Sequence, residues 1–410
     1  MTFFEELEWR GLIKDVAGDD IADKLNNEKI SFYWGTDPTA DSLHLGHYSS
    51  LVTAKRLAKY GHHPILLCGG ATGLIGDPRP TAEREIITKE KLNENLEGIK
   101  KQVTEIFEGK AEVVNNYDWF QGYEFTDVLR DIGKYITVNY MLDKDIIKRR
   151  LETGITFAEF AYMLIQGYDF LWLYENKNCI MQVEGSDQWG NITTGIDLIK
   201  KKLGKDAYAF TMPLVLDKYG NKFGKSEGNA LWLDEEKTSS YELYQYLINV
   251  DDEMVIPYLK IFTFLSVDEI KELEKKNKEH PELREAHKAL AREIITDLHG
   301  EKSYLNAVKI SESLFSGDIK SFSSKDIEVA FKGLDPFEIS EDLNIVDLLV
   351  QAGVCSSKRE AREFVSNSSI TLNGDKVTDL DFVLTKDKCI DSKYVVIRRG
   401  KKKYYIGNYK

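Results

Sequence analysis

The sequence has little of what would cross-link a protein, anchor it in a membrane or export it. Its 410 residues include only four cysteines, Cys68, Cys179, Cys355 and Cys389, and they are scattered along the chain. This spacing argues against a zinc cluster and against a disulfide framework. The longest apolar runs are about five residues, far below the ~20 that span a bilayer. Residues 1–20 are rich in acidic side chains, unlike a signal peptide, so we expect a soluble cytoplasmic protein.

Basic charge is scarce overall but concentrated at one end. The net charge of −13 argues against indiscriminate binding to DNA or to anionic membranes. Residues 393–410, however, hold seven lysines and arginines and no acidic side chain. This stretch is either a solvated tail or a surface that faces a polyanion, and its position alone favours neither.

Short apolar runs alternate with helical patterns between residues 30 and 216. Strands that alternate with helices predict an α/β fold, a Rossmann-like parallel sheet with helices on both faces. The expected strands are 30–34, 64–68, 111–114, 179–183 and 212–216, and the expected helices are 46–60, 88–108, 123–134, 143–153, 156–175 and 191–203.

The rest of the chain predicts two further modules. From residue 238 to about residue 315 only helical periodicity remains, until the Ser316-Gly317 break. Two short helices then precede an Asn373-Gly374 hairpin turn, a pattern typical of a small α+β module. The expected division is an α/β domain at 1–216, a linker at 217–238, an all-helical domain at 239–315, a second linker at 316–342 and a C-terminal module at 343–410.

The segment from Gly35 to His47 joins the first predicted strand to a helix. Ligands of open α/β sheets bind where such a loop leaves the carboxyl end of a strand, and a helix N-terminus attracts phosphate. His44 and His47 share one face of the first turn, and Gly46 leaves room for a ribose or a base. Two histidines at this spacing alone would favour a surface position or a metal site. The setting indicates contact with phosphate and ribose.

A second basic loop, Lys222-Phe-Gly-Lys-Ser226, lies well downstream. Two lysines three residues apart, with glycines around them, could close over a triphosphate. An exposed turn with incidental lysines is the alternative, and the pattern alone favours it.

Three polar residues align on one predicted helix. Tyr162, Gln166 and Asp169 are four and three residues apart, so they share a face of a helix that is otherwise largely apolar. Buried polar groups need partners, which here are either a polar ligand or an internal hydrogen-bond network.

Taken together, the segments resemble a known family. Pro38–His47 and Lys222–Ser226 resemble the two signature motifs of class I aminoacyl-tRNA synthetases. The segments at 69–78, 116–119, 162–169, 185–191 and 398–405 resemble the bacterial tyrosyl members of that class. The resemblance covers nearly the whole chain and implies a catalytic α/β domain, an anticodon-side helical domain and an RNA-binding C-terminal module.

The resemblance implies a two-step reaction. L-Tyrosine and ATP, with Mg²⁺ as a phosphate ligand, form tyrosyl-adenylate, and the tyrosyl group then passes to tRNA(Tyr). No protein nucleophile is needed, so catalysis rests on alignment and on charge stabilisation. The sequence carries no carboxylate cluster for a dedicated metal site. The implied catalytic residues are Thr39, His44, His47, Arg84, Lys222, Lys225 and Ser226.

The same resemblance assigns the binding residues. Tyr33 and Asp169 would read the phenol hydroxyl of tyrosine, and Asp77, Tyr162 and Gln166 would hold its ammonium group. Gln188 is also assigned to tyrosine. The implied ATP-binding residues are Gly35, Asp37, His44, Gly46, His47, Asp187, Gln188 and Lys225.

The implied RNA contacts lie in two regions. Lys358, Arg359 and Arg362 on one predicted helix, with Arg398, Lys401 and Lys402 in the basic tail, suit phosphate contact and base stacking. Lys144, Lys148, Arg149 and Arg150 are candidates for the acceptor end of tRNA, with a solvated helix face as the alternative. The family is dimeric, and Phe157 is expected near the subunit interface.

The sequence departs from the family pattern at three places. Trp34 stands where a small residue is usual near the ribose, so that contact could become stacking or bulk exclusion. A lysine usual after Asp77-Pro78 is missing, and Glu184 replaces a glycine. The alternatives are a tryptophanyl enzyme, a non-catalytic RNA-binding paralogue and a nucleotidyl transferase. Asp169, the C-terminal module and the intact His44, His47, Lys222 and Lys225 argue against them.

Overall fold

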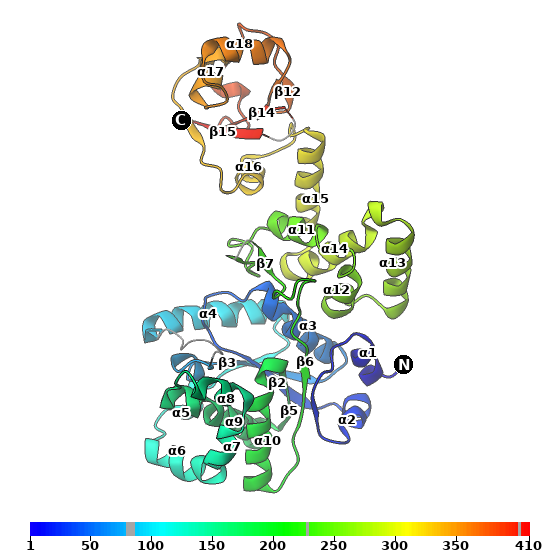
Figure 1. Cartoon of the computed structure of the whole chain (residues 1–410), viewed down its shortest axis with the longest axis vertical. Helices are drawn as coiled ribbons and strands as arrows, with labels where there is room; N and C mark the ends of the chain where they lie inside the picture. Colours follow the sequence, from blue (N-terminus) through cyan, green and yellow to red (C-terminus); the bar gives the residue numbers. More distant parts are fainter. Residues whose placement is uncertain (79–86, 227–228, 401–402) are drawn as a thin grey trace. The chain divides into compact units, whose positions relative to one another are not determined.

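The computed structural model describes residues 1–78, 87–226, 229–400 and 403–410. The chain forms two compact units (Figure 1). Met1–Thr238 with Tyr246–Leu298 make up the first, and Ser239–Gln245 with His299–Lys410 make up the second. No helix within the described ranges is long and apolar enough to cross a membrane.

A twisted sheet forms the centre of the first unit. Its strands lie in the order β1-β6-β5-β2-β3-β4. They are β1 Val16–Ala17, β2 Ser31–Thr36, β3 His63–Cys68, β4 Glu112–Asn115, β5 Cys179–Gly185 and β6 Tyr208–Met212. Every neighbouring pair is parallel except β1 with β6. The predicted Rossmann-like parallel sheet is confirmed.

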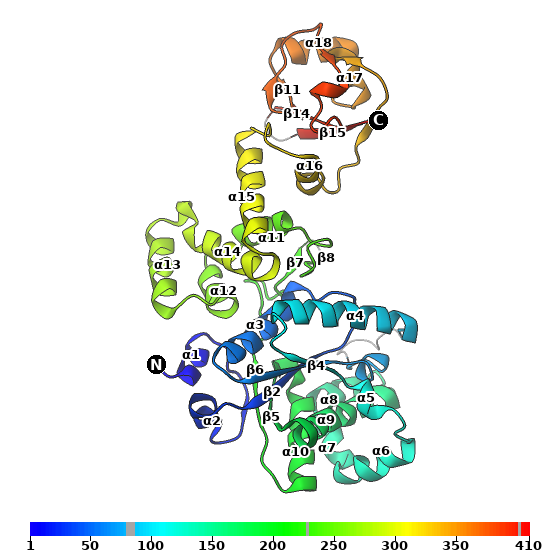
Figure 2. The same cartoon turned by 180° about the vertical axis from the view of Figure 1, so that it is seen from behind.

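Helices cover both faces of this sheet. Figures 1 and 2 show α3 (Leu45–Lys59) and α4 (Lys89–Ile106) on one face, and α9 (Phe157–Lys177) and α10 (Trp189–Leu203) on the other. Side chains alternate along a strand, so Tyr33 packs into the core beneath α9, whereas the buried indole of Trp34 donates a hydrogen bond to Ser50 of α3 at 3.0 Å. The smaller helices are α1 Phe3–Trp9, α2 Ile21–Asn27, α5 Tyr117–Phe120, α6 Phe125–Asp131, α7 Val138–Leu142 and α8 Asp145–Leu151.

Two sequence predictions in this unit need correction, and one strand was missed. The last parallel strand is Tyr208–Met212, not 212–216, because Pro213 follows it and has no amide hydrogen for the ladder. The helix predicted at 123–134 is divided into α6 and the 3₁₀ turn Gly133–Tyr135. The edge strand β1 was not predicted, because two residues carry no alternating pattern.

The predicted helical region is divided between the two units. It contains α11 Ser240–Ile248, α12 Val255–Phe262, α13 Val267–Glu279, α14 Glu285–His299 and α15 Glu301–Ser316. Helices α12 and α13 and nearly all of α14 belong to the first unit, and α15 belongs to the second. The prediction of helices in this region is therefore correct. The helices do not form one separate domain, however, because they are divided between the two units.

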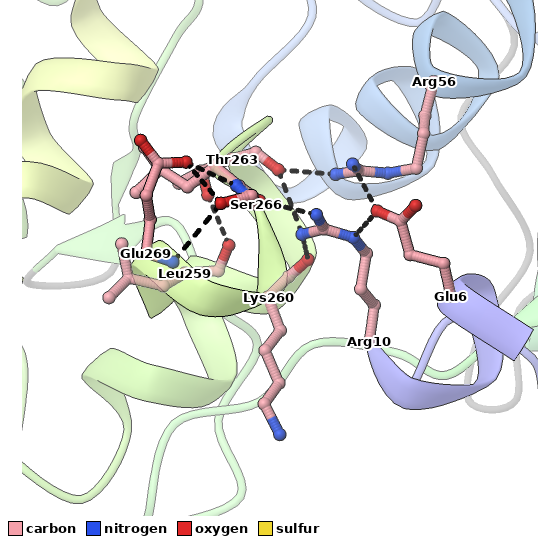
Figure 3. Close-up of polar contacts among 9 residues, drawn as sticks. Glu6, Arg10, Arg56, Leu259, Lys260, Thr263, Ser266 and Glu269 are labelled. Carbon is pink, nitrogen blue, oxygen red and sulfur yellow. Dashed lines mark hydrogen bonds and ion pairs between the residues drawn. The ribbon is translucent and has the colours of Figure 1, made fainter. Parts of the chain in front are cut away.

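Two buried arginines join α12 to the rest of the first unit (Figure 3). Arg10, directly after α1, donates to the carbonyls of Lys260 at 2.9 Å and Leu265 at 2.6 Å, and Arg56 of α3 donates to Thr263 at 2.6 Å. Glu6 forms an ion pair with Arg10 at 2.7 Å. The last carbonyls of a helix lack partners within the helix. Here residues 260–265, at the end of α12 and beyond it, receive charged donors from α1 and α3.

The second unit holds a smaller sheet. Its strands lie in the order β12-β11-β14-β15-β9 and are β9 Phe337–Ile339, β11 Ile370–Leu372, β12 Asp375–Lys376, β14 Tyr394–Arg399 and β15 Lys403–Tyr409. A further pair joins β10 Leu343–Asn344 to β13 Val383–Leu384. Helices α17 Ile345–Gln351 and α18 Lys358–Ser366 are the two short helices predicted before the Asn373-Gly374 turn. The predicted Asn373-Gly374 turn has φ of 48° and 93°, as a two-residue hairpin requires.

Residues 316–342, expected as a linker, are structured in part. They hold α16 Ser324–Ala330 and β9, which pairs in parallel with β15. Ile319, Phe322 and Ile327 are buried together with Val396 and Ile406 of the sheet. The C-terminal fold therefore begins well before residue 343.

Candidate functional site

A chain of hydrogen bonds links the α9 face of the sheet to the loops above it. The carboxylate of Asp169 accepts from the Asn116 amide at 3.0 Å and from the Trp119 indole at 2.8 Å. The same Asn116 amide donates to the Thr72 hydroxyl at 3.0 Å, and Thr72 donates to Asp37 at 2.6 Å. The predicted polar face of α9 is thus part of a larger network that reaches β2 through Asp37.

Tyr162 closes this network at its other end. Its hydroxyl donates to Asp37 at 2.9 Å, and its ring is buried. The network therefore begins and ends on α9, at Tyr162 and Asp169, and passes through three loops between them. Asp37, expected at the ATP, directs its carboxylate into this α9-side network.

The inner end of the network is buried and carries an acidic side chain. Asp169 is 1% exposed, and burial raises its pKa to about 8, against the hydrogen bonds from Asn116 and Trp119 that favour the charged form. Burial also raises the pKa of the Tyr33 hydroxyl, with the Asp169 charge as the next cause. Tyr33 of β2 and Asp169 of α9 therefore lie close enough in the same buried space to interact electrostatically.

Three buried polar atoms around this space have no hydrogen-bond partner within the described part of the chain. They are the Tyr33 hydroxyl, Oε1 of Gln166 and Nε2 of Gln182. Tyr33 and Gln182 are neighbours across β2 and β5, and Gln166 lies on α9 between Tyr162 and Asp169. A buried group without a partner costs about 1–3 kcal/mol, so this cluster indicates a polar ligand that supplies the missing partners.

A second polar cluster surrounds Asp77. Its two oxygens accept from Gln188 at 3.0 Å and from Asn191 at 3.1 Å, and Asn191 also donates to Gln188 at 3.0 Å. Gln188 and Asn191 lie at the start of α10, directly after β5. The structure thus brings together Asp77 and Gln188, both predicted to bind tyrosine. Asp187, predicted at the ATP, is exposed beside them.

The two histidines of the first motif cap helix α3. Nδ1 of His44 accepts from the Gly46 amide at 3.1 Å, and Nδ1 of His47 accepts from the His44 amide at 3.4 Å. Their rings stack at 3.9 Å between centroids. Because Nδ1 accepts in both rings, each neutral ring carries its proton on Nε2. The cap thus sets both tautomers at a helix N-terminus, where anions bind favourably.

The second motif lies directly against the first. Gly224 has a φ of +84°, and a Cβ at this position would come within 2.8 Å of the Leu45 Cβ and 3.0 Å of the Gly46 amide. The Leu45 amide donates to Leu231 at 2.7 Å, which fastens the segment after the loop to the start of α3. The two halves of the predicted ATP site, distant in sequence, are therefore in backbone contact.

An aromatic cluster anchors the second motif. Phe223 is 2% exposed and packs against Tyr246, Tyr258 and Phe262, with the nearest ring centroid, that of Tyr258, at 4.4 Å. The Gly224 amide donates to the Tyr246 hydroxyl at 3.0 Å. Lys222 is exposed, and β7 (Lys225–Ser226) pairs with β8 (Asn229–Ala230). The loop is thus held at Phe223 while Lys222 faces solvent.

The other predicted residues lie on a loop, at a strand end or outside the described residues. Thr39 is exposed at the loop before α3, and Gly35 lies at the end of β2. Arg84, Lys401 and Lys402 fall outside the described ranges. Within those ranges, no group of three histidines, cysteines or acidic residues is arranged to hold a metal ion.

The candidate RNA-binding residues differ in their surroundings. Arg150 is buried and pairs with Glu159 through both oxygens, at 2.7 and 2.9 Å, so its assignment to RNA was wrong. Lys144 donates to Tyr140 at 2.6 Å and to Thr193 at 2.9 Å. Exposed positions are taken by Lys148, Arg149, Lys358, Arg359 and Arg362, and Arg398 is half-buried.

Sequence reasoning missed several members of the site. The segment 116–119 was used only as a family mark, yet Asn116 and Trp119 both bind Asp169. Thr72, Gln182 and Asn191 were not singled out, because each reaches the site through residues far away in sequence. These three residues could have been found by one signal in the sequence. Each carries a polar amide or hydroxyl side chain within a predicted buried strand or shortly after it.

Comparisons with known proteins identify the family of the chain. A family model described as "tRNA synthetases class I (W and Y)" matches residues 25–316. The chain belongs to this family. A second model, described as "Tyrosine–tRNA ligase SYY-like C-terminal domain", matches residues 326–406. That match also begins before residue 343, as the second sheet does.

Individual relatives of this class I synthetase match its sequence over the whole chain. It is 48% identical to the tyrosine–tRNA ligase of Streptococcus gordonii and 50% identical to that of Streptococcus pyogenes serotype M3, with both chains covered completely. It is also similar to the structure of a C-terminally truncated Aspergillus nidulans mitochondrial tyrosyl-tRNA synthetase. That match has a TM-score of 0.68 and 33% identity, and covers 77% of this chain and 94% of the other. The predicted family, fold class and aminoacyl-tRNA ligase activity are confirmed.

Proposed function

We propose that this class I synthetase is a tyrosine–tRNA ligase. It joins L-tyrosine to ATP as tyrosyl-adenylate, releases pyrophosphate and transfers the tyrosyl group to the 3′ end of tRNA(Tyr). The observation that carries the choice of amino acid is the pair at the inner end of the pocket. The Tyr33 hydroxyl has no partner within the described residues, and Asp169 lies buried beside it, so a phenol hydroxyl could bond to both.

The geometry supports a division of the site into two ends. Tyr33 and Asp169 take the phenol, while Asp77, Tyr162, Gln166 and Gln188 take the amino end. Gly35, Asp37, Gly46 and Asp187 line the nucleotide. Thr39, His44 and His47 meet the phosphates from the α3 side, and Lys222 meets them from the second motif. Arg84, Lys225 and Ser226 are assigned to the phosphates from the sequence alone.

The chemistry follows from this arrangement. The tyrosine carboxylate is itself the nucleophile, and it attacks the α-phosphate while pyrophosphate leaves. The chain needs only to align the two reactants and to stabilise the charge that develops on the phosphates. Nε2–H donors of His44 and His47 at a helix N-terminus suit this task. Mg²⁺ enters as a ligand of the ATP phosphates and belongs to the substrate.

The deciding assay is amino-acid-dependent exchange of pyrophosphate into ATP. We expect exchange with tyrosine and none with tryptophan. Exchange with tryptophan alone would select the other branch of the family, and no exchange with either would contradict an amino-acid-activating function.

Apolar side chains on neighbouring elements support a homodimer. Phe125 and Leu129 of α6, Val138 of α7, Leu151 of α8 and Phe157 of α9 are all at least 49% exposed. Exposed apolar side chains that gather on the surface mark protein–protein interfaces, and these five, which all come from residues 125–157, suit contact with a second copy of the chain. We also propose a cytoplasmic location, where the chain would meet both ATP and tRNA.

A further inference from the structure

The sheet splits between its two central strands. Pairing of β2 with β5 stops at Tyr33 and Gln182, although β5 continues to Gly185 and stays paired with β6 to that residue. The strand order also reverses here, since β3 and β4 follow on one side of β2 and β6 follows on the far side of β5. Open α/β sheets bind their ligands in the crevice at such a point.

Glu184 fills this crevice from the β5 side. It is 7% exposed, and its Oε1 accepts a hydrogen bond from the backbone amide of Gly35 at the end of β2. A Cβ at Gly35 would lie 3.6 Å from that oxygen. The side chain thus replaces the strand-to-strand hydrogen bond that the split removes. Glu184 is also one of the residues at which the sequence departs from the family pattern.

The surroundings of Glu184 disfavour a negative charge. Burial is the main cause that raises its pKa well above the usual range, and the carboxylates of Asp187 and Asp37 act in the same direction. The amides of Gly35 and Gly185 oppose this shift without reversing it. Tyr33 on β2 is the further titratable group that acts with Glu184. An ionised Glu184 would therefore add a third negative charge beside the place where a triphosphate binds.

We propose that Glu184 is a positioning residue for ATP that works as an uncharged acid, with its carbonyl oxygen holding the Gly35 amide at the floor of the crevice. The proposal rests on the proposed function, because it assumes that the nucleotide is ATP. An uncharged acid accepts the amide hydrogen as a carboxylate would, yet it does not repel the phosphates. Its effect should fall on ATP and leave tyrosine, which lies toward Asp169, unaffected.

Two substitutions separate the hydrogen bond from the charge. Glu184→Gln keeps an acceptor for Gly35 and can never ionise, whereas Glu184→Ala removes the acceptor. We would measure kcat and the KM values for ATP and tyrosine by tyrosine-dependent pyrophosphate exchange between pH 6 and pH 9.5, with the full-length chain. Glu175→Gln, an exposed carboxylate on α9, is the control for loss of one charge elsewhere.

We expect Glu184→Gln to match the wild type in ATP KM at pH 7, and Glu184→Ala to raise it about tenfold, as expected for one lost hydrogen bond of ~1.4 kcal/mol. Tyrosine KM should stay within about twofold in both. The relevant quantity is the ATP KM of the wild type divided by the ATP KM of Glu184→Gln. Protonation of ATP and of the motif histidines affects both proteins equally, so it cancels in this ratio. That ratio of ATP KM should stay constant or rise with pH.

Three results would overturn the proposal. Glu184→Gln could be as impaired as Glu184→Ala at pH 7, Glu184→Ala could match the wild type, or the wild type could improve relative to Glu184→Gln as pH rises. The first and third results would mean that the ionised carboxylate of Glu184 assists ATP binding. The second would mean that Glu184 has no role in ATP binding. Absence of exchange in the wild type would instead contradict the proposed function. Unchanged tyrosine binding by the variants shows that they are folded.

Discussion

At the scale of single residues, Tyr33 is the group that would distinguish tyrosine from phenylalanine. Its buried hydroxyl has no partner within the described chain, so a substrate hydroxyl would satisfy it. Tyr33→Phe should lower the preference for tyrosine over phenylalanine in pyrophosphate exchange by roughly three- to tenfold, the value of one uncharged hydrogen bond. Tyr174→Phe is the matched control, since its hydroxyl bonds to the Asp206 carbonyl outside the pocket. Equal effects of the two changes would contradict the role of Tyr33.

Asp169 should make stability depend on pH. Its pKa rises from 3.8 to about 8 on folding, so the folded chain holds a proton that the unfolded chain releases. A raised pKa contributes stability that is complete below the unfolded value and is lost as pH rises through the folded value. Between pH 5 and pH 8 the wild type should therefore lose stability, on the order of a few kcal/mol, relative to Asp169→Asn. Thermal melts of both proteins across this range would test the sign, and parallel curves would contradict it.

At the scale of elements, the contact between the two motifs makes a sharp prediction about Gly224. Gly224→Ala would strain a positive φ and drive a Cβ into Leu45 and the Gly46 amide. Gly220 has the same φ of +84° but nothing within 4 Å of its Cβ position, so Gly220→Ala isolates the backbone strain. We expect Gly224→Ala to slow adenylate formation by about a hundredfold or more, with tyrosine affinity unchanged. Similar exchange rates for the two variants would show that the motif contact is unimportant.

The elements also show which parts of the fold a sequence can predict. The start of α3 near His44 and His47 is local, so its letters and spacing were enough to predict a helix there, although the capping hydrogen bonds of the two rings were not predicted. The network from Asp169 through Asn116 and Thr72 to Asp37 depends on three separate loops, and no local pattern encodes their meeting. The exact position of β6 and the existence of β9 also could not be predicted, because both depend on pairing with strands distant in sequence. Trp34 was expected to crowd the ribose, but side-chain alternation turns its indole toward Ser50 instead.

At the scale of the whole molecule, helix α18 should bind RNA without affecting activation. Replacing Lys358, Arg359 and Arg362 by alanine should reduce kcat/KM for tRNA charging about ten- to a hundredfold and weaken its salt dependence, because phosphate contacts are lost. Pyrophosphate exchange should not change. Alanines at Lys91, Lys101 and Lys110, exposed lysines of the first unit, remove the same charge elsewhere and should leave charging intact. Equal loss from both triple variants would indicate a general effect of net charge.

Assembly is testable through Phe157. Phe157→Glu places a charge in the apolar surface of residues 125–157 and should convert a dimer into monomers in sedimentation experiments. Phe315→Glu is the control, because Phe315 is 96% exposed but lies on α15 in the other unit. A monomeric wild type, or equal behaviour of the two variants, would contradict the proposed interface.

The arginine contacts of Figure 3 impose an order on how the chain can acquire its structure during synthesis. Arg10 is among the first residues to leave the ribosome, yet its carbonyl partners at Lys260, Thr263 and Leu265 are made some 250 residues later. Strand β1 likewise cannot pair until β6 has been synthesised. Contacts this distant in sequence form late and slowly. The amino-terminal segment must therefore remain exposed to chaperones and proteases until most of the first unit has been translated, and it completes the catalytic unit last.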